Sequence, residues 1–442
     1  MNAPVALSET IGFAPGLDEE MRNIVVIGGG FAGCAAVRRL RGRLPAGYRL
    51  VLISEESYTT FNPLLAEVVG ASIFPEQIVA PLRQVAPPSE QCRFVMARVR
   101  EFDASARTLT CETLAGPMRV AYDQLVLAFG NLARTDFLPG FAEHALPLKT
   151  VGDALELRNV VLRRLARIEL ERDAQERSAL GAFVIVGGGF SGVELAGELV
   201  DVLAAIRKYY PRVHASELKV TLVQDQPYLL PEMPPSLRVA AQASLERRGV
   251  EIRLGQRAAS ADADSLTLAN NEILYTRTLI ASAGVRPHPL AQASGLLLER
   301  GRIVVEPDLS AVGFDGIWAL GDCAHVRNAQ DGEVCPPTAQ FAVRHGALLA
   351  DNILRRLCGQ PTRAFRYRPR GALATVGRLN GVAEIYGVRF TGLTAWLLWR
   401  AFYLIRVPTF GRKLRIWAEW TWGMLFSADI THFRFTRSGV ER

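Results

Sequence analysis

Gly28-Gly29-Gly30-Phe31-Ala32-Gly33 and Gly187-Gly188-Gly189-Phe190-Ser191-Gly192 decide the fold of this chain. Each of these glycine loops follows a short apolar run, at residues 24–27 and 183–186. An apolar run too short for a helix that ends in glycine predicts a buried parallel strand followed by a tight turn. A helical pattern comes next in both places, at residues 34–40 and 193–203. The sequence therefore predicts the same strand-loop-helix unit twice.

The three outer glycines of each loop have separate tasks in such a unit. The first makes the turn, the second lets the backbone approach a pyrophosphate, and the third lets the helix pack on the strand, with the phosphates at the helix N-terminus. One such motif is a weak signal, but two in this context predict an α/β protein with two Rossmann-like dinucleotide-binding domains. The glycines concerned are Gly28, Gly30 and Gly33, and then Gly187, Gly189 and Gly192.

Length and composition agree with a globular protein of two or three domains. The chain has 442 residues, of which 49% are hydrophobic and 21% charged. Its six cysteines form no CxxC pair, so the sequence predicts neither a disulfide framework nor a metal site. A reducing compartment is the simplest interpretation. Residues 1–21 carry acidic side chains and no sustained apolar run, which predicts a loose extension and argues against a signal peptide.

The first nucleotide unit continues into an apolar run at residues 49–53 that ends in Ser54-Glu55-Glu56. A carboxylate about 20 residues beyond such a loop often binds a ribose 2′-hydroxyl, and Glu55 is at that distance. Glu56, or a strand end that is only solvated, is the alternative. A further apolar run, at residues 124–128, leads into Gly130.

The second unit has its own second strand, residues 218–223, which ends in Gln224-Asp225. Gln224 stands where NADH sites often carry glutamate, and an amide does not repel a 2′-phosphate. However, Asp225 is adjacent, and no Lys or Arg follows before Arg238. The sequence favours NADH and leaves NADPH open.

A last apolar run, at residues 317–320, leads into Gly321-Asp322. The carboxylate of Asp322 could bind the polyol of a flavin, or it could cap the next helix. Since this segment follows the second glycine loop, we expect the second domain to be inserted in the first. The expected boundaries are 22–145 with 290–370 for the first domain, 146–289 for the inserted second domain, and 371–442 for a C-terminal region.

The order of these motifs resembles the two-dinucleotide-domain flavoproteins. Within them the chain is similar to the type II NADH:quinone oxidoreductases, the single-subunit, non-pumping NADH dehydrogenases. The specific matches are FNPLLAE at residues 61–67, GVELAGE at 192–198 and PTAQFAVR at 337–344. The resemblance covers about residues 22 to 432, which is everything but the tails.

The resemblance implies FAD in the first domain, a nicotinamide nucleotide in the second, and a quinone that arrives where Ala339 and Gln340 face the flavin. It implies catalytic roles for Glu194, Gln340 and Arg344, although Arg344 replaces the glutamine usual in the family. The implied FAD residues are Gly28, Gly30, Phe31, Ala32, Gly33, Glu55, Gly130, Gly321, Asp322, Ala339 and Gln340. The implied NAD(P)H residues are Gly187, Gly189, Gly192, Glu194, Gln224 and Gly284.

The C-terminal region is basic and aromatic. Five of the six tryptophans lie between Trp396 and Trp422, and residues 387–442 hold nine Lys or Arg against three Asp or Glu. The apolar stretch at 393–407 is too short to span a bilayer and carries two arginines, so it suits a helix lying in the membrane interface. A second helix is expected at 412–426. The alternative is a helical hairpin packed on the protein's own core or in a homodimer.

Together these features predict a peripheral enzyme on the cytoplasmic face of the cell membrane that oxidises NADH with FAD and reduces a quinone. Nucleic-acid binding is not expected, because the basic residues alternate with large aliphatic ones. A disulfide reductase would need a cysteine pair where residues 55–91 hold none. A sulfide:quinone reductase using Cys323 and Cys335, a ferredoxin-type reductase, and an NADH-binding sensor without turnover remain as alternatives.

Overall fold

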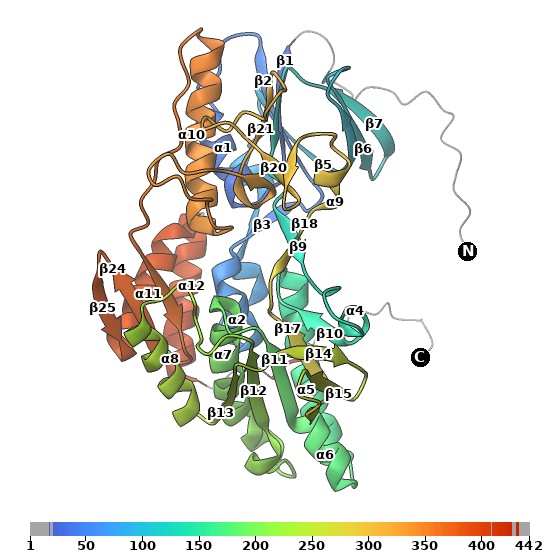
Figure 1. Cartoon of the computed structure of the whole chain (residues 1–442), viewed down its shortest axis with the longest axis vertical. Coiled ribbons are helices and arrows are strands. Elements are labelled where there is room, and N and C mark those ends of the chain that lie inside the picture. Colours follow the sequence, from blue (N-terminus) through green and yellow to red (C-terminus); the bar gives the residue numbers. More distant parts are fainter. Residues whose placement is uncertain (1–16, 18–20, 408, 427–429, 433–442) are drawn as a thin grey trace. The chain divides into compact units, whose positions relative to one another are not determined.

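The computed structural model describes residues 17, 21–407, 409–426 and 430–432. The extension expected at 1–21 therefore lies almost wholly outside the described residues, although Leu17 is buried in the core. The chain divides into two compact units (Figure 1). The first unit comprises residues 1–59, 80–132 and 286–368, and the second comprises 60–79, 133–285 and 369–442. This division differs from the expected boundaries because residues 60–79 and 133–145 pack with the second unit.

The first unit is built on a seven-stranded sheet of order β21-β8-β1-β2-β5-β6-β7. The first five strands pair in parallel, and β5, β6 and β7 form an antiparallel meander. The central strands are buried on both faces, as their continuous apolar sequences require. The strands are β1 (Arg22–Ile27), β2 (Tyr48–Ser54), β5 (Cys92–Asp103), β6 (Thr108–Thr113), β7 (Gly116–Ala121), β8 (Gln124–Leu127) and β21 (Ile317–Ala319).

Helices α1 and α10 pack closely on each other in the first unit. The contact depends on Gly346, where a Cβ would lie 2.3 Å from the carbonyl oxygen of Ala32. Outside the seven-stranded sheet, the elements of this unit are α1 (Phe31–Leu40), α3 (Leu82–Val85), α9 (Pro289–Gln292), β19 (Leu298–Glu299), β20 (Arg302–Val304), η5 (Gly321–Cys323), β22 (Ala324–His325) and α10 (Ala339–Leu357).

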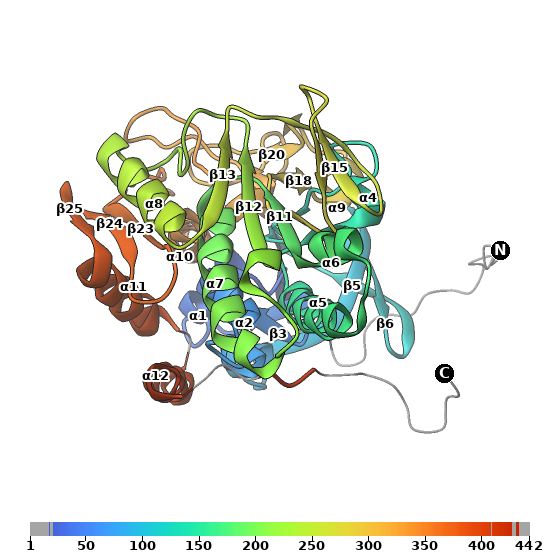
Figure 2. The same ribbon diagram turned by 90° about the horizontal axis from the view of Figure 1, so that it is seen from below.

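The second unit holds a five-stranded parallel sheet of order β10-β17-β11-β12-β13. Helix α7 packs against β11, β12 and β13 (Figure 2), while apolar side chains of β14 and β15 share a core with β11 and β17. The elements are α4 (Phe141–His144), β10 (Ala145–Pro147), α5 (Val151–Leu170), α6 (Ala174–Gly181), β11 (Ala182–Val186), α7 (Phe190–Ile206), η3 (Arg207–Tyr209), η4 (Ala215–Glu217), β12 (Lys219–Gln224), α8 (Pro235–Arg247), β13 (Val250–Leu254), β14 (Ala258–Ala261), β15 (Ser265–Leu268), β16 (Ile273–Tyr275) and β17 (Thr278–Ala281).

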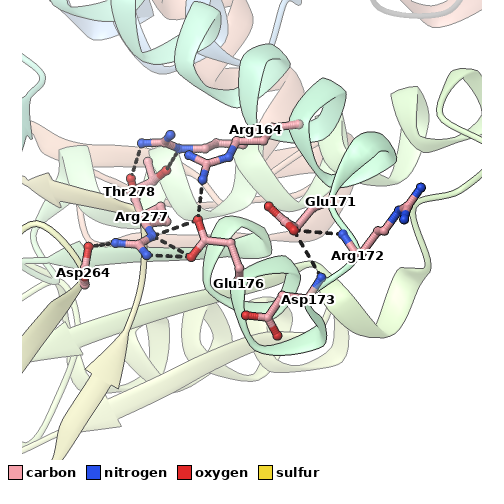
Figure 3. Close-up of polar contacts among 9 residues, drawn as sticks. Arg164, Glu171, Arg172, Asp173, Glu176, Asp264, Arg277 and Thr278 are labelled. Atoms are coloured by element: carbon pink, nitrogen blue, oxygen red, sulfur yellow. Dashed lines mark hydrogen bonds and ion pairs between the residues drawn. The ribbon is translucent and has the colours of Figure 1, made fainter.

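A network of charged side chains ties this sheet to its helices at the amino ends of the strands (Figure 3). Arg277, just before β17, forms an ion pair of 2.6 Å with Glu176 of α6 and a second one with Asp264. Arg164 of α5 donates a hydrogen bond of 3.2 Å to Thr278 Oγ1. This edge is opposite the glycine loop that follows β11, so the network is structural.

The C-terminal segment belongs to the second unit. Helix α11 packs on a three-stranded antiparallel sheet, and α12 contacts α11 and η2. No helix in the described part of the chain is both long and apolar enough to cross a bilayer. The elements of this segment are β23 (Gly371–Thr375), β24 (Gly381–Ile385), β25 (Val388–Thr391), α11 (Gly392–Arg406) and α12 (Phe410–Leu425). Short elements between residues 58 and 81 are β3 (Tyr58–Thr60), η1 (Asn62–Leu64), α2 (Leu65–Val69), η2 (Pro75–Gln77) and β4 (Val79–Pro81). Two further short strands are β9 (Asn131–Ala133) and β18 (Val285–Pro287).

A pair of interfacial helices would expose all of its tryptophans, but the tryptophans of this segment do not all face outward. Trp396, Trp399 and Trp420 are buried, with exposed fractions of 3%, 1% and 4%, whereas Trp417 and Trp422 are exposed. Two of the buried three donate their indole N–H to buried carboxylates, Trp399 to Glu194 and Trp420 to Glu67. The alternative of packing on the protein's own core is thus correct for these three.

Candidate functional site: two dinucleotide loops

The first glycine loop leaves the N-terminus of α1 open. Gly28 has a φ of +109°, and a Cβ there would lie 2.4 Å from the carbonyl oxygen of Ala128. A Cβ on Gly33 would lie 2.0 Å from the carbonyl oxygen of Gly28. The helix can therefore pack this closely on the loop only with glycine at position 33. No side chain caps α1 at Gly30, and a Cβ on Gly30 would meet nothing within 4 Å. This open, uncapped helix end fits a pyrophosphate.

The other residues implied for FAD in the first unit come from neighbouring strand ends. β1, β8 and β21 end at the same level of the sheet, which places Gly130 and the Gly321-Asp322 turn at the edge that carries the loop. Asn131 Nδ2 donates a hydrogen bond of 2.9 Å to Asp322 Oδ2. Arg302 faces Asp322, and its buried Nε has no hydrogen-bond partner among the described residues. A polar ligand such as FAD fits this edge.

Glu55 lies just beyond the end of β2, the strand next to β1. Its carboxylate forms an ion pair of 2.6 Å with Arg98, and both side chains are about half exposed. The carboxylate therefore stands at the surface beside the loop. Phe31 and Ala32 open α1 itself, and a Cβ on Gly321 would lie 3.0 Å from the Cβ of Ala32.

Ala339, Gln340 and Arg344 share the first turns of α10, also in the first unit. Arg344 donates a hydrogen bond of 2.7 Å to the backbone carbonyl of Gln340. Its guanidinium carbon lies 4.0 Å from the ring centroid of Tyr367, a cation–π contact. The arginine that replaces the family's glutamine is thus held beside Gln340 and leaves a fixed positive charge there.

His345 was not singled out in the sequence, yet it supports the same edge. It is buried, and its Nδ1 accepts a hydrogen bond of 3.3 Å from the backbone N–H of Gly321. Burial lowers the pKa of His345 to about 3, so the ring stays neutral and keeps this acceptor. Only the contact reveals this role, because a lone histidine within a helix carries no motif.

The second glycine loop repeats the first in detail. Gly187 has a φ of +115°, and a Cβ on Gly192 would lie 1.9 Å from Gly187 O. Gly189 opens α7 with no side-chain cap and with nothing within 4 Å of a Cβ. Beside the loop, Ser282 Oγ is buried without a hydrogen-bond partner in the described part of the chain. A second dinucleotide fits here, with Gly284 two residues beyond Ser282.

Gln224 and Asp225 take different positions at the end of β12. Gln224 is buried, and its Oε1 accepts a hydrogen bond of 2.7 Å from the backbone N–H of Gly188. The strand registers, Ile27 with Ile53 and Val186 with Val223, make Gln224 the counterpart of Ser54. By the same registers, the exposed Asp225 is the counterpart of Glu55.

Glu194 lies one turn into α7, beyond the free N–H groups of the helix end. Its Oε1 accepts hydrogen bonds of 3.2 Å from the backbone N–H of Thr375 and from Trp399 Nε1. Burial raises the pKa of Glu194 to about 8. Glu194 and the second loop belong to the second unit, whereas Gln340 and Arg344 belong to the first.

Cys323 and Cys335 give no support to a sulfide:quinone reductase. Both are buried, free cysteines, and burial raises the pKa of each thiol to about 11. A thiol with such a pKa is protonated at neutral pH, whereas sulfur redox chemistry needs the thiolate.

Each of these two glycine loops precedes a helix whose N-terminus has no side-chain cap. This arrangement is typical of an oxidoreductase that binds a flavin and a pyridine nucleotide. Residues 22–346 match the model of the pyridine nucleotide-disulphide oxidoreductase family. The curated relatives place the chain more narrowly. It is 31% identical to the type II NADH:quinone oxidoreductase Ndh of Mycobacterium tuberculosis, over 90% of this chain and 87% of the relative. The chain belongs to the type II NADH:quinone oxidoreductases.

Other comparisons agree on family and fold. The chain is 30% identical to the type II NADH:quinone oxidoreductase of Staphylococcus saprophyticus, over 85% of this chain and 93% of that one. The solved structure of NDH2 from Plasmodium falciparum in complex with NADH has a TM-score of 0.86 at 16% identity, over 93% of this chain and 99% of that one. A sulfide:quinone oxidoreductase from Aquifex aeolicus has a TM-score of 0.68 at 17% identity, covering 90% of this chain and 92% of that one.

Proposed function

We propose that this chain is an FAD-dependent NADH:quinone oxidoreductase that takes two electrons from NADH and delivers them to a membrane quinone without pumping protons. The observation that carries the proposal is the repeated loop, one in each unit, each with an uncapped helix N-terminus and an empty space where a Cβ would lie. FAD, when bound, supplies the chemistry that couples hydride acceptance to electron delivery.

The first unit would hold FAD. The N–H groups at the start of α1 would bind its phosphates, Glu55 its ribose, and Asp322 its polyol. Gly130, Gly321, Ala32 and Phe31 line the same edge, and Asn131 and His345 hold the Gly321-Asp322 turn in place. Gln340 would orient the quinone carbonyl, with the fixed charge of Arg344 beside it.

The second unit would hold the nicotinamide nucleotide at Gly187, Gly189 and Gly192, with Gly284 across the pocket. We assign its ribose to Asp225, because Gln224 already accepts the N–H of Gly188 beneath the loop. A carboxylate at the ribose repels a 2′-phosphate, so the site prefers NADH over NADPH.

The Asp225→Asn variant is expected to weaken NADH binding about tenfold, since a charged hydrogen bond contributes about 1.5–3 kcal/mol. NADPH should lose less, because the repulsion is removed as well. Initial rates measured over a range of NADH and of NADPH concentrations give the Michaelis constant for each nucleotide.

Gln224→Glu serves as the comparison. A glutamate could accept the same Gly188 N–H and would leave the preference as it is. If Gln224→Glu alters the NADH-to-NADPH ratio while Asp225→Asn does not, the ribose is bound by the side chain at 224.

The outer face of α12 is the proposed membrane contact. Phe410, Leu414, Trp417 and Leu425 are spaced to lie on one side of the helix, and all are more than half exposed. Arg412, Lys413 and Arg415 lie on the same helix and suit anionic headgroups. A peripheral position on a membrane follows from this proposal, while the cytoplasmic face of the cell membrane and the homodimer stay predictions.

Gln340→Ala is expected to slow quinone reduction by about a hundredfold while leaving flavin reduction by NADH within about twofold. The reason is that Gln340 would act on the quinone only. Rapid mixing separates the two steps, because the flavin loses its colour with NADH and regains it with quinone. Equal losses in both steps would remove Gln340 from the quinone site.

The function as a whole is tested with the purified holoenzyme, NADH and vesicles that contain quinone. NADH consumption that depends on quinone is the expected result. Flavin reduction by NADH without quinone turnover would instead support a sensor, and sulfide oxidation in place of NADH oxidation would support the sulfide reductase.

A further inference from the structure

The helices α1 and α10 of the first unit end side by side (Figure 1). Gly346 lies against Ala32 near the start of α1, and Asp351 pairs with Arg39 near its end, so the two helices run in the same direction. The first glycine loop precedes the start of α1. The helix ends are therefore remote from this loop, because the nine positions from Gly30 to Arg39 span about 13 Å along the helix.

A pocket of about 340 Å³ opens between these helix ends. Its size is within the range of small-molecule sites, about 300–1,000 Å³. Asp351 is the only acidic side chain among the described residues that line it. The positively charged lining residues are Arg39, Arg43, Arg355 and Arg363. Four positive charges thus face one negative charge.

Asp351 is already engaged by the arginines from the end of α1. Arg39 donates two hydrogen bonds to its carboxylate, of 2.9 and 2.7 Å, and Arg43 donates one of 3.1 Å. The hydrogen bonds from Arg39, and then those from Arg43, hold the pKa of Asp351 below its usual range. The carboxylate is therefore ionised at neutral pH, and its hydrogen bonds go to these two arginines alone.

The other two arginines have no acidic partner in the described part of the chain. Arg355 donates a hydrogen bond from Nε to the carbonyl oxygen of Pro361, which leaves its terminal amino groups available. Arg363 is exposed, and its guanidinium has no hydrogen-bond partner among the described residues. Its backbone is fixed, since Asn352 accepts its N–H at 2.9 Å and donates to its carbonyl at 2.9 Å. The fold thus holds two uncompensated guanidinium groups at the pocket.

The chemistry of these donors points to phosphate. A guanidinium presents paired N–H groups that match two oxygens of one phosphate, and the hydrogen bonds are strengthened by charge. A phosphate monoester carries nearly two negative charges at neutral pH, more than a single carboxylate, and so suits this excess of positive charge better.

We propose that this pocket binds the phosphate group of a ligand other than FAD and NADH. The group could belong to a soluble phosphorylated compound or to the headgroup of an anionic phospholipid, and the test below separates these two sources. The inference goes beyond the proposed function, because none of the residues assigned there to FAD, NADH or quinone lines the pocket.

Cys358 makes occupancy of the pocket measurable. It lines the pocket and is exposed, whereas the other five cysteines are buried. Alkylation of the holoenzyme by iodoacetamide is followed at Cys358 by mass spectrometry. We expect pyrophosphate at about 1 mM to slow this alkylation about fivefold or more. Sodium chloride at the same ionic strength should have little effect, which separates binding from screening.

The double variant Arg355→Gln/Arg363→Gln is expected to lose the protection, with less than about twofold remaining. The matched control is Arg93→Gln/Arg119→Gln, which removes the same charge from exposed arginines on β5 and β7 of the same unit and should stay protected. Rates with and without pyrophosphate are compared within each variant, so a change in the reactivity of the thiol itself cancels. Flavin content should be unchanged in both variants.

Vesicles identify the source of the phosphate. Protection of Cys358 by pyrophosphate assigns the pocket to a soluble compound. Protection by phosphatidylglycerol vesicles, with none by phosphatidylcholine vesicles or by pyrophosphate, assigns it to a lipid headgroup. If neither probe protects Cys358, or if Arg355→Gln/Arg363→Gln is protected as well as wild type, the inference is overturned. Alkylation requires no turnover, so a failure of the proposed function would be seen separately.

Discussion

Alanine in place of Gly33 is expected to give a folded protein that has lost its flavin. The added Cβ would lie 2.0 Å from the carbonyl oxygen of Gly28, which is backbone and cannot turn aside. Overpacking against movable side chains costs about 1–3 kcal/mol, and the cost here is larger because the backbone oxygen cannot move aside. We therefore expect the helix and the loop to separate. The phosphate-binding N–H groups move with them. We expect the flavin content of the purified protein to fall by about tenfold or more.

The control for this variant is Gly152→Ala. Gly152 lies in α5, where a Cβ would meet only Thr150 Oγ1 at 3.6 Å. Alanine there should keep the flavin and favour the helix slightly. Flavin absorbance per protein, read beside circular dichroism, separates loss of the cofactor from loss of the fold. A Gly33→Ala protein with full flavin would show that this loop does not hold the phosphates.

Serine at the four positions of the proposed membrane contact on α12 is expected to release the protein from membranes. The positions are Phe410, Leu414, Trp417 and Leu425, with exposed fractions of 81%, 56%, 55% and 76%. Each large apolar side chain that enters a nonpolar phase contributes about 1.5–3 kcal/mol. Even at half burial, four together should weaken binding to vesicles by about a thousandfold. Co-sedimentation with vesicles measures it.

The matched control places serine at four exposed apolar positions elsewhere, Leu114, Leu170, Val239 and Tyr275. That variant should still sediment with vesicles, because it loses similar apolar area away from α12. If the α12 variant also sediments unchanged, the membrane contact lies on another surface. Replacing Trp396, Trp399 and Trp420 would be a poor test, since these side chains are buried and their loss would disturb the fold.

The two Rossmann-like units could be predicted because their local sequence is decisive. A buried strand, a glycine turn and a helix leave little choice of conformation, and the structure shows both loops with nearly the same geometry at Gly28 and Gly187. The α/β fold and the family are confirmed. The assignment of site residues stays a prediction.

The environment of the C-terminal tryptophans could not be predicted from composition. An amphipathic aromatic segment has the same sequence pattern whether it covers lipid or covers its own protein. What turns Trp399 and Trp420 inward is a pair of buried carboxyls on distant segments, Glu194 and Glu67, which accept their indole N–H groups. Glu67 and Glu198 end the motifs FNPLLAE and GVELAGE, which indicate the family but do not show that these two carboxyls are buried. Their electrostatic interactions with Arg400 appear only once the chain is folded.

The sequence alone does not separate the roles of Gln224 and Asp225 at the end of β12. The end of a strand predicts which residues are near a ribose, but not which of two neighbours points outward. The strand registers answer this, since Gln224 is buried under the loop and Asp225 is exposed.

The central claim, that one chain moves two electrons from NADH to a quinone, is tested most directly by a sequential experiment without oxygen. One equivalent of NADH is added to the purified holoenzyme, and then one equivalent of a short-chain quinone. We predict that the flavin absorbance disappears with NADH and returns fully with quinone, with one quinol formed per NADH consumed. Flavin that stays reduced after the quinone is added, or that never responds to NADH, would contradict the account.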